Sequence, residues 1–290
     1  MVKELVIISG KGGSGKTSIT LALSSLFENK LMVDCDVDAT DMHLILNPNI
    51  KEKHAFYSGK KAVIDEFKCI KCGICKSFCA FDAISDEITI NDYFCEGCGA
   101  CRIKCPQEAI SLEKQKSGEW FESKTRLGDL IHAKLGVGEE NSGKLVSQIR
   151  TQARINANKQ KNDLIIIDGP PGIGCPVIAS ITGADVVLVV IEPTLSGLHD
   201  AKRIIELAKH FKVKATACIN KFDVNQQICT EIEEFLQENN VEFLGKIPYG
   251  KDFTKAMIEN KTLIEYNENS EISKEINNIK IKMEGILYEQ

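Results

Sequence analysis

The chain has 290 residues, of which 43% are hydrophobic and 27% charged, and its formal net charge is −5. This composition is typical of a soluble globular protein with a sizeable core, and the negative charge argues against non-specific binding to nucleic acid. We find no signal peptide, because a strand-like run begins by Leu5, and no apolar stretch of the ~20 residues that a transmembrane helix needs. We therefore expect a cytoplasmic protein that binds neither nucleic acid nor a membrane.

Short apolar runs along the chain predict buried parallel strands. They lie at residues 4–9, 31–33, 163–168, 185–191 and 215–219. Near-continuous apolar sequence is typical of a parallel sheet, because its strands are covered by helices on both faces. Helical patterns follow the strands, at about 16–27, 197–211 and 226–239. This alternation predicts an α/β fold with a doubly wound, mainly parallel sheet.

The first strand is followed by G-K-G-G-S-G-K-T, which matches the pattern G-x4-G-K-[ST]. Between a strand and a helix, this pattern predicts the phosphate-binding loop of a P-loop NTPase. Its backbone N–H groups would surround the phosphates, Lys16 would reach the β- and γ-phosphates, and Thr17 would bind Mg²⁺. The predicted nucleotide-binding residues of the loop are Gly10, Gly12, Gly13, Ser14, Gly15, Lys16 and Thr17.

Eight of the twelve cysteines form two runs, each spaced C-x2-C-x2-C-x3-C, at residues 69–79 and 95–105. Adding 26 to each cysteine of the first run gives a cysteine of the second, and Ala83-Ile84 likewise becomes Ala109-Ile110. The two runs are therefore halves of one internal repeat. Because cytosolic thiols are kept reduced, metal binding is a stronger prediction than a disulfide framework.

The cysteine spacing is that of bacterial two-cluster ferredoxins, in which the fourth cysteine of each run binds the other cluster. We predict that Cys69, Cys72, Cys75 and Cys105 hold one [4Fe–4S] cluster, and that Cys95, Cys98, Cys101 and Cys79 hold a second. Two zinc sites are the alternative, although structural zinc usually takes two short cysteine pairs held well apart in sequence. Pro106 follows Cys105 as in ferredoxins, whereas Ala80 follows Cys79.

The repeat interrupts the α/β pattern between the second and third strands. We predict a small inserted α+β domain, like a bacterial ferredoxin, over residues 62–113, and a P-loop domain over residues 1–61 and 114–290. The segment 114–162 is polar and expected to be helical in parts, with a loop at 136–144. The tail 271–290 has apolar residues at helical spacing, and its mixed charges predict docking on its own domain rather than on a membrane.

The loop K-G-G-x-G-K-T resembles the deviant Walker A loop of the MinD/ParA/Mrp and nitrogenase-iron-protein class of ATPases. The resemblance implies that Lys11 reaches across a dimer interface to the partner's nucleotide. It implies that Asp36 positions or deprotonates the attacking water, although Asp34 and Asp38 are near enough for that assignment to shift by two residues. The resemblance thus implies catalytic roles for Lys11, Lys16, Asp36 and Asp168.

The same resemblance extends to the residues after the later strands. Asp168 matches the Walker B carboxylate, which holds Mg²⁺ directly or through water, and Gly172 matches the glycine whose N–H senses the γ-phosphate. N-K-F-D at residues 220–223 is a guanine-reading signature in G proteins, but in the resembled class an asparagine at this place contacts adenine. We therefore expect Asn220 to contact ATP rather than GTP.

The other cysteines are expected to play structural parts, with Cys35, Cys218 and Cys229 in the core or in helices. Cys175 is the seventh residue after Asp168. The nitrogenase iron protein has a cysteine at the corresponding place that helps to hold a cluster between two subunits. That protein needs a second cysteine ahead of its Walker B strand, where this chain has E-E-N-S-G-K. We therefore expect instead a thiol near the switch II segment around Gly172 or near the dimer interface.

Taken together, the chain resembles MinD-superfamily P-loop ATPases that carry an inserted ferredoxin domain. Two further motifs that resemble this group are G-P-P-G-I-G-C-P-V (169–177) and E-P-T-L-S-G-L-H-D-A-K (192–202). The resemblance implies Mg²⁺-dependent ATP hydrolysis, a nucleotide-dependent homodimer, and electron transfer through two [4Fe–4S] clusters. The partner would be a metalloenzyme, a cluster-assembly protein or another redox protein. An Fe–S or metal carrier ATPase is the alternative, and a MinD-like positioning ATPase is a third hypothesis.

Overall fold

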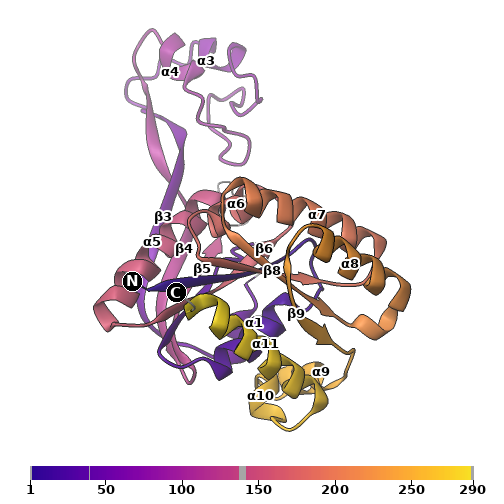
Figure 1. Ribbon diagram of the computed structural model, residues 1–290. Coiled ribbons are helices and arrows are strands. Elements are labelled where there is room, and N and C mark those ends of the chain that lie inside the picture. Colours follow the sequence, from indigo (N-terminus) through magenta and orange to yellow (C-terminus); the bar gives the residue numbers. More distant parts are fainter. Residues whose placement is uncertain (1, 39, 137–141, 289–290) are drawn as a thin grey trace. The chain divides into compact units, whose positions relative to one another are not determined.

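The computed structural model describes residues 2–38, 40–136 and 142–288 (Figure 1). The chain divides into two compact units. The first, which we call the sheet unit, covers Met1–His54, Trp120–Lys134 and Ser142–Gln290. The second, the cysteine unit, covers Ala55–Glu119 together with Leu135–Asn141. The insertion predicted over 62–113 lies inside the cysteine unit.

The described residues form nine strands and eleven α-helices. The strands are β1 (Lys3–Ser9), β2 (Lys30–Asp34), β3 (Asn49–Ile64), β4 (Ile110–Thr125), β5 (Gly128–Leu135), β6 (Leu164–Pro171), β7 (Val186–Ile191), β8 (Lys214–Asn220) and β9 (Glu242–Ile247). The helices are α1 (Lys16–Leu26), α2 (Met42–Leu46), α3 (Ile74–Ser77), α4 (Ala100–Lys104), α5 (Ser142–Gln160), α6 (Cys175–Ile181), α7 (Leu195–His210), α8 (Gln226–Glu238), α9 (Asp252–Ile258), α10 (Leu263–Tyr266) and α11 (Glu271–Tyr288). A 3₁₀ turn covers Phe222–Val224.

The strands form one sheet in the order β3-β4-β5-β2-β6-β1-β7-β8-β9. From β5 to β9 every neighbouring pair is parallel, which confirms the predicted parallel-dominated α/β fold. The five predicted strands correspond to β1, β2, β6, β7 and β8. Strands β3 and β4 each continue from the sheet unit into the cysteine unit.

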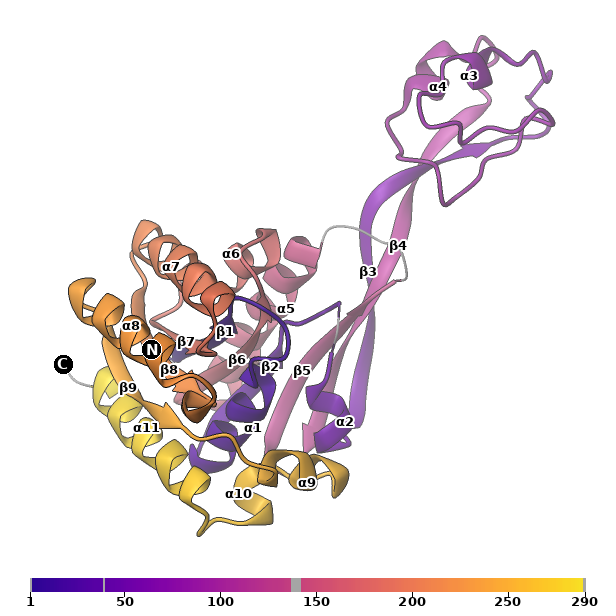
Figure 2. The same cartoon turned by 90° about the vertical axis from the view of Figure 1, so that its right-hand side faces the viewer.

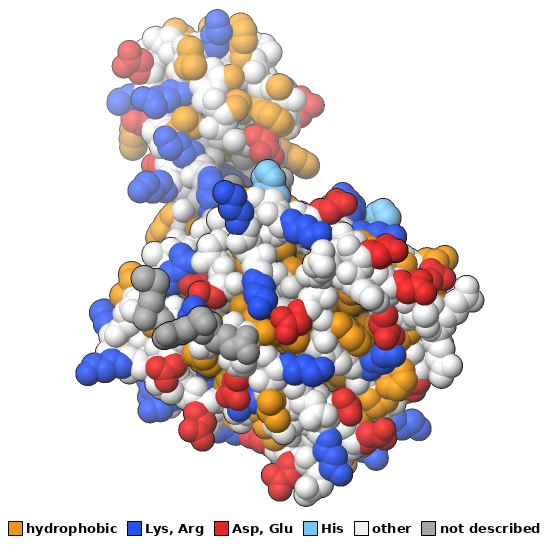
Figure 3. Space-filling view, viewed as in Figure 1, with side chains coloured by type: hydrophobic (Ala, Val, Ile, Leu, Met, Phe, Trp, Pro, Cys, Tyr) orange, Lys and Arg blue, Asp and Glu red, His pale blue; other side chains and the backbone are white. Residues whose placement is uncertain are grey.

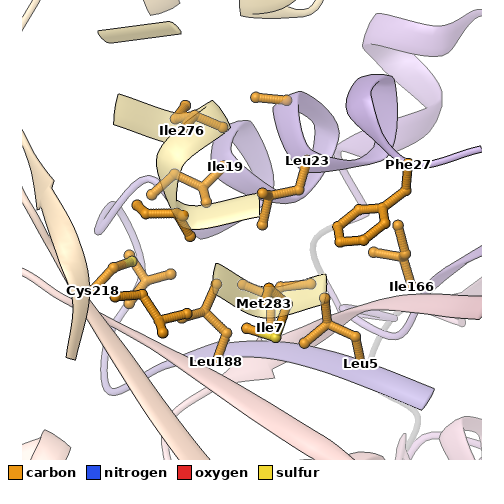
Figure 4. Close-up of a cluster of buried hydrophobic side chains, with 14 of the residues drawn as sticks. Leu5, Ile7, Ile19, Leu23, Phe27, Ile166, Leu188, Cys218, Ile276 and Met283 are labelled. Carbon is orange, nitrogen blue, oxygen red and sulfur yellow. The ribbon is translucent and has the colours of Figure 1, made fainter. Parts of the chain in front are cut away.

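Helices cover both faces of the sheet (Figure 2). On one face, α1 and α11 pack on the sheet and on each other, and on the other face lie α5, α6 and α7. Leu5 and Ile7 of β1 belong to the core beneath α1 and α11 (Figure 4), while Val6 and Ile8 alternate with them and are equally buried. This burial on both faces explains the unbroken apolar run of the strand.

The C-terminal helix α11 docks on its own unit, as predicted. Ile276 and Met283 are fully buried in the same core as Ile19 and Leu23 of α1 (Figure 4). The apolar positions of this helix are therefore satisfied within the chain.

The segment 114–162 is helical in part, as predicted, and its other part forms two strands that the sequence analysis did not predict. Residues up to 125 belong to β4, residues 128–135 form β5, and α5 begins at Ser142. The polar strand β4 alternates buried and exposed residues weakly, so its sequence lacks the apolar run that marked the inner strands. Most of the predicted loop at 136–144 lies outside the described residues.

The cysteine unit repeats its local structure as it repeats its sequence. Helices α3 and α4 each begin directly after a glycine in the left-handed conformation, Gly73 with φ 77° and Gly99 with φ 81°. The small core of the unit combines Ile84, Ile88 and Ile110 with Cys75 and Cys101. The two halves are thus built alike, each with its second cysteine just before a short helix.

Candidate nucleotide and metal sites

The carboxyl ends of the inner strands meet at one edge of the sheet, where open α/β proteins bind ligands. Strand β1 leads into the glycine-rich loop at 10–15, and β2 leads to Asp36. Asp168 lies in β6, Glu192 directly follows β7, and Asn220 ends β8. These five segments are distant in sequence, but the parallel strands bring them to the same edge.

Lys16, Thr17 and Asp168 form a buried cluster at the start of α1. Lys16 Nζ lies 2.9 Å from Asp168 Oδ2, and Thr17 Oγ1 donates to the same oxygen at 2.7 Å. Thr20, one turn further along α1, donates to Asp168 Oδ1 at 2.7 Å. The sequence analysis missed Thr20, although its spacing of three from Thr17 places both hydroxyls on one face of the helix.

Nearby carboxylates stabilise the charge of the buried Lys16 amine. Burial by itself would lower the pKa of Lys16, but the Asp168 and Asp36 carboxylates outweigh it and raise that pKa. Asp168 is only 1% exposed, and its carboxylate has hydrogen bonds to both oxygens. A cationic amine and a hydroxyl thus meet one carboxylate, which is the donor set that P-loop NTPases use for phosphate and Mg²⁺.

Asp34 ends β2, and Asp36 and Asp38 follow it. Of these three aspartates, Asp36 pairs with the lysine, with Oδ2 3.7 Å from Lys16 Nζ. Asp34 is fully buried and accepts from the backbone N–H groups of Asp36 and Met42, so it shapes the loop. Burial raises the pKa of Asp34 well above its usual range, and repulsion from Asp168 adds to the effect. Asp38 is exposed. The geometry favours Asp36 as the aspartate that faces a nucleotide.

The loop requires glycine where α1 begins. Gly15 has φ +88°, and a Cβ there would lie 2.3 Å from Nδ2 of Asn220. That Nδ2 donates to the Ser14 carbonyl at 2.7 Å, so Asn220 braces the loop in this structure. A Cβ at Gly10 would lie 2.1 Å from Cβ of Asp200 in α7, whereas Gly12 and Gly13 have open space around them. Contact of Asn220 with a base stays a prediction.

Lys11 is held within its own chain. Its Nζ lies 2.8 Å from Glu192 Oε2 and donates to Thr194 Oγ1 at 3.1 Å. Lys221 Nζ lies 2.9 Å from the other oxygen of Glu192 and donates to the Gly13 carbonyl. Burial would raise the pKa of Glu192, but these two lysines lower it. The sequence analysis did not single out Glu192, although it opens the quoted motif at 192–202.

One polar group of the site is unpartnered. Ser14 Oγ is buried within the phosphate loop and has no hydrogen-bond partner among the residues that the structure describes. The space beside Gly12 and Gly13 is open, which is where a phosphate needs room to approach the backbone.

Gly172 has φ +89°, and its N–H donates to the Ser9 carbonyl at 2.9 Å. Its predicted contact with a γ-phosphate stays a prediction.

The eight repeat cysteines line two separate hollows, with about 330 and 340 Å³ of space that is partly open to solvent. The first hollow is lined by Cys69, Cys72, Cys75 and Cys105, and the second by Cys79, Cys95, Cys98 and Cys101. Each hollow therefore takes three cysteines from one half of the repeat and the fourth from the other half. These are the two sets that the spacing predicted, and no disulfide links the described cysteines.

Burial and hydrogen bonding of the sulfurs also follow the repeat. The second cysteine of each run is exposed, the third is buried, and the first and fourth are intermediate. Burial raises the pKa of the Cys75 and Cys101 thiols. Backbone N–H groups point at sulfur at equivalent places, from Ala83 to Cys79 Sγ at 3.4 Å and from Ala109 to Cys105 Sγ at 3.3 Å.

The distances between cysteine sulfurs would differ between a single bound zinc ion and a larger metal group. Four sulfurs around one zinc ion at ~2.3 Å lie about 3.8 Å apart in a tetrahedron. Within residues 2–38, 40–136 and 142–288, no three cysteine sulfurs lie within 4.8 Å of one another. The sulfurs are thus not gathered as they would be around a single tetrahedral ion, and four thiols in each hollow are also the donor set of a [4Fe–4S] cluster, which stays a prediction.

The four cysteines outside the repeat lie in the sheet unit. Cys35 and Cys218 are fully buried, and burial raises the pKa of Cys218 to about 12. Cys229 in α8 is also buried, and burial raises its pKa to about 11. These three have the core or helix positions that were predicted. Cys175 is the exposed first residue of α6, and its place in a dimer stays a prediction.

No helix in the part of the chain that the structure describes is both long enough and apolar enough to cross a membrane.

Comparison with known proteins relates the chain to nucleotide-binding proteins. Residues 5–264 match the family described as "CobQ/CobB/MinD/ParA nucleotide binding domain". An uncharacterized protein of Methanocaldococcus jannaschii is 37% identical over 297 residues, which span 99% of this chain and 98% of the relative. The septum site-determining protein MinD of Synechocystis is 25% identical over 86% of this chain and 76% of its own length.

Solved structures show the same fold. MinD from Pyrococcus horikoshii, complexed with Mg-ADP, superposes with a TM-score of 0.60 at 18% identity and covers 100% of both chains. The MinD cell division protein of Aquifex aeolicus gives a TM-score of 0.57 at 18% identity, over 98% of each chain.

Proposed function

Because the chain belongs to the CobQ/CobB/MinD/ParA family of nucleotide-binding proteins, we propose that it is a Mg²⁺-dependent ATPase that carries two [4Fe–4S] clusters. Its nucleotide cycle would control electron transfer through the cysteine unit to a partner metalloprotein. The observation that carries the proposal is the pair of hollows, each lined by four cysteines taken three and one from the two halves of the repeat.

The nucleotide half of the proposal rests on the cluster at the sheet edge. Lys16 would bind the β- and γ-phosphates, while Thr17 and Asp168 would hold Mg²⁺ between their oxygens, which now share a hydrogen bond of 2.7 Å. Asp36 lies beside Lys16 and would orient the attacking water. The solved MinD structure complexed with Mg-ADP supports this arrangement by its fold.

Cluster binding rests on the donor chemistry of the cysteine unit. Eight thiolates would hold the two clusters, which supply one-electron transfer when bound. The backbone N–H groups of Ala83 and Ala109 lie within hydrogen-bonding distance of Cys79 and Cys105, and such contacts stabilise thiolate charge. The exposed Cys72 and Cys98 would leave each cluster close to the surface, within reach of a partner.

A dimer would give Lys11 its proposed role. In the single chain the Lys11 amine is held by Glu192 and Thr194. The phosphates of a nucleotide bound to a second copy carry more negative charge than one carboxylate, and would compete for this lysine. Nucleotide-dependent dimerisation would therefore exchange a contact within the chain for a contact between chains.

The surface of the cysteine unit is suited to a protein partner. Hydrophobic side chains lie on its surface (Figure 3), among them Phe67, Tyr93 and Ile103, which are 103%, 89% and 81% exposed. Exposed aromatic and aliphatic groups on so small a unit are typical of an interaction surface.

The proposal is tested by preparing the protein without oxygen and measuring iron, sulfide and zinc. We expect about eight irons and eight sulfides per chain, from two four-iron clusters. Dithionite reduction should then give an EPR signal of reduced clusters. Stoichiometric zinc with no iron, in protein purified from cells grown with both metals, would contradict the cluster assignment.

An Fe–S carrier has the same cysteine ligands, so a second experiment separates it from an electron carrier. Holo-protein is incubated with Mg²⁺-ATP and an apo-ferredoxin, and the iron in each protein is measured after separation. An electron carrier keeps its iron through repeated reduction and oxidation. Transfer of iron to the apo-ferredoxin that depends on ATP would favour the carrier.

A MinD-like positioning function is the second candidate, because curated relatives include septum site-determining MinD proteins. The C-terminal helix speaks against membrane attachment in this chain, since Ile276 and Met283 are fully buried in the core. Sedimentation with anionic liposomes, with and without ATP, tests this candidate, and ATP-dependent binding would favour it.

A further inference from the structure

Three side chains that can bind a metal meet in the sheet unit, away from the cysteines. Glu52 and His54 lie on β3, and Glu122 lies on the neighbouring strand β4. Residues two apart on a strand point to the same face, so Glu52 and His54 share one side of β3. One nitrogen of His54 and one oxygen from each glutamate all lie within 4.8 Å of one another.

The ring nitrogen of His54 is the observation that points to a ligand. Nε2 lies 3.3 Å from Glu52 Oε2 and 4.0 Å from Glu122 Oε1. The His54 side chain is 34% exposed, but this nitrogen is itself buried and makes no hydrogen bond with any residue that the structure describes. Buried polar atoms without a hydrogen-bond partner are rare in folded proteins, and each needs an explanation. The imidazole is fixed in place by stacking on Trp120, with 3.9 Å between ring centroids and 14° between planes.

Helix α5 orients the third member of the group. Gln152 Nε2 donates to Glu122 Oε1 at 3.0 Å, and Asn156 Nδ2 donates to Glu122 Oε2 at 2.8 Å. The two amides are four residues apart, so they project from one face of α5. Neutral donors that hold a carboxylate while leaving its charge uncompensated are typical of the residues behind metal ligands.

We propose that Glu52, His54 and Glu122 form a binding site for one divalent first-row transition-metal ion, separate from the nucleotide and cysteine sites. Ligand atoms at ~2.0–2.1 Å from such an ion lie about 3.3 Å apart when tetrahedral. The nitrogen and oxygen of His54 and Glu52 are 3.3 Å apart, so they can bind one ion without a large movement. Imidazole with carboxylates suits Mn²⁺, Fe²⁺ or Zn²⁺ rather than the thiolate-preferring ions.

Mn²⁺ is the probe of choice, because thiolates bind it weakly and the EPR signal of the free ion disappears on binding. Anaerobic, oxidised, nucleotide-free protein is titrated with Mn²⁺. The Thr17→Ala protein is used in parallel, so that Mn²⁺ at the nucleotide site is not counted. We expect one saturable Mn²⁺ per chain in both proteins, and binding at least about 10-fold weaker in His54→Gln and in Glu122→Gln.

Glu119→Gln is the matched control, because it removes a carboxylate from the same strand, where it pairs with Lys116 at 2.6 Å. This variant should bind Mn²⁺ as the wild type does. Gln152→Ala leaves the three ligands in place and should weaken binding by about 10-fold through loss of orientation. Melting temperatures within a few degrees of wild type exclude misfolding as the cause. Absence of saturable Mn²⁺ binding in the Thr17→Ala protein, or equal binding in folded His54→Gln and Glu122→Gln, would overturn the proposal.

Discussion

In the sheet unit, the candidate phosphate site is stabilised by the chain's own charges, since Lys16 is paired with Asp168 at 2.9 Å and Lys11 with Glu192 at 2.8 Å. In the cysteine unit, eight thiols surround two hollows, and their sulfurs accept hydrogen bonds from neutral backbone N–H groups, such as those of Ala62, Ala83 and Ala109. The first site is folded before its ligand arrives. The second has a small apolar core, and a bound metal group would supply much of its folding free energy.

We therefore expect the loss of one side chain to affect local folding differently at the two sites. In the sheet unit, a lost charge leaves an unpaired partner but keeps the fold, because the strands have a large core of their own. In the cysteine unit, a lost thiol would remove one of the proposed cluster ligands, and the small core there would lose the stabilisation that the bound cluster supplies.

The largest expected effect is on the phosphate site. Lys16→Ala removes the amine that lies 2.9 Å from Asp168 and that would bind the β- and γ-phosphates. ATP hydrolysis should fall by about 100-fold or more, as for loss of one preorganised donor to a developing charge. Steady-state phosphate release measures it. Iron content should stay at the wild-type value, and turnover equal to wild type would remove the phosphate-loop assignment.

A second prediction concerns pH and the sheet unit alone. Burial lowers the pKa of His132 to about 4 from 6.5, and nearby His43 adds to the shift. Between these values the unfolded chain binds a proton that the folded chain does not, so the free energy of unfolding falls as the pH drops below 6.5. From pH 7.5 to 5.5 the loss should be about 1.4 kcal/mol.

Urea unfolding at the two pH values, monitored for the sheet unit, measures this slope. His132→Gln should flatten it by about that amount, whatever the substitution does to the stability at pH 7.5. His199→Gln is the control, because the His199 side chain is 68% exposed. An unchanged slope in His132→Gln would mean that another group carries the pH response.

The smallest expected effect is on the cysteine unit, where each hollow can be tested separately. Cys72→Ser and Cys98→Ser each remove one exposed sulfur, from the first and the second hollow respectively. Each variant should keep roughly half of the iron, because the other cluster retains all four ligands. Iron analysis of anaerobically purified protein measures this loss.

Cys175→Ser is the control for these two variants, since this exposed thiol lies in the sheet unit and should leave the iron content unchanged. Loss of iron in Cys175→Ser would instead support a cluster held between two copies of the chain. Complete loss of iron in both repeat variants would mean that the clusters bind only as a pair.

The sequence predicted the parts of the fold in which local pattern and environment agree. The run Leu5–Ile8 is apolar because both faces of β1 are covered, and the loop at 10–17 has glycine where Gly15 must adopt φ +88°. The cysteines lining each hollow are the sets that the ferredoxin-like spacing suggested, while their binding of clusters stays a prediction. Strand β9 was missed, because Glu242, Gly245 and Lys246 interrupt its apolar residues.

Contacts between distant residues could not be predicted in this way. Glu192 is separated from Lys11 by more than half of the chain, and only the order of the parallel strands brings them together. His54 and Glu122 likewise meet only because β3 and β4 are neighbours in the sheet. Local periodicity contains no information on strand order, so such pairs need the three-dimensional structure.

The fourth cysteine of each run lies in the hollow of the other run, so neither half of the cysteine unit contains a complete set by itself. Cys105 belongs to the hollow of the first run, and Cys79 to that of the second. A cut anywhere between residues 80 and 94 would leave two peptides that each lack one cysteine of their own hollow. One repeat alone could complete its ligand set only by associating with a second copy of itself. The two halves of the repeat therefore depend on each other for a complete set of four cysteines.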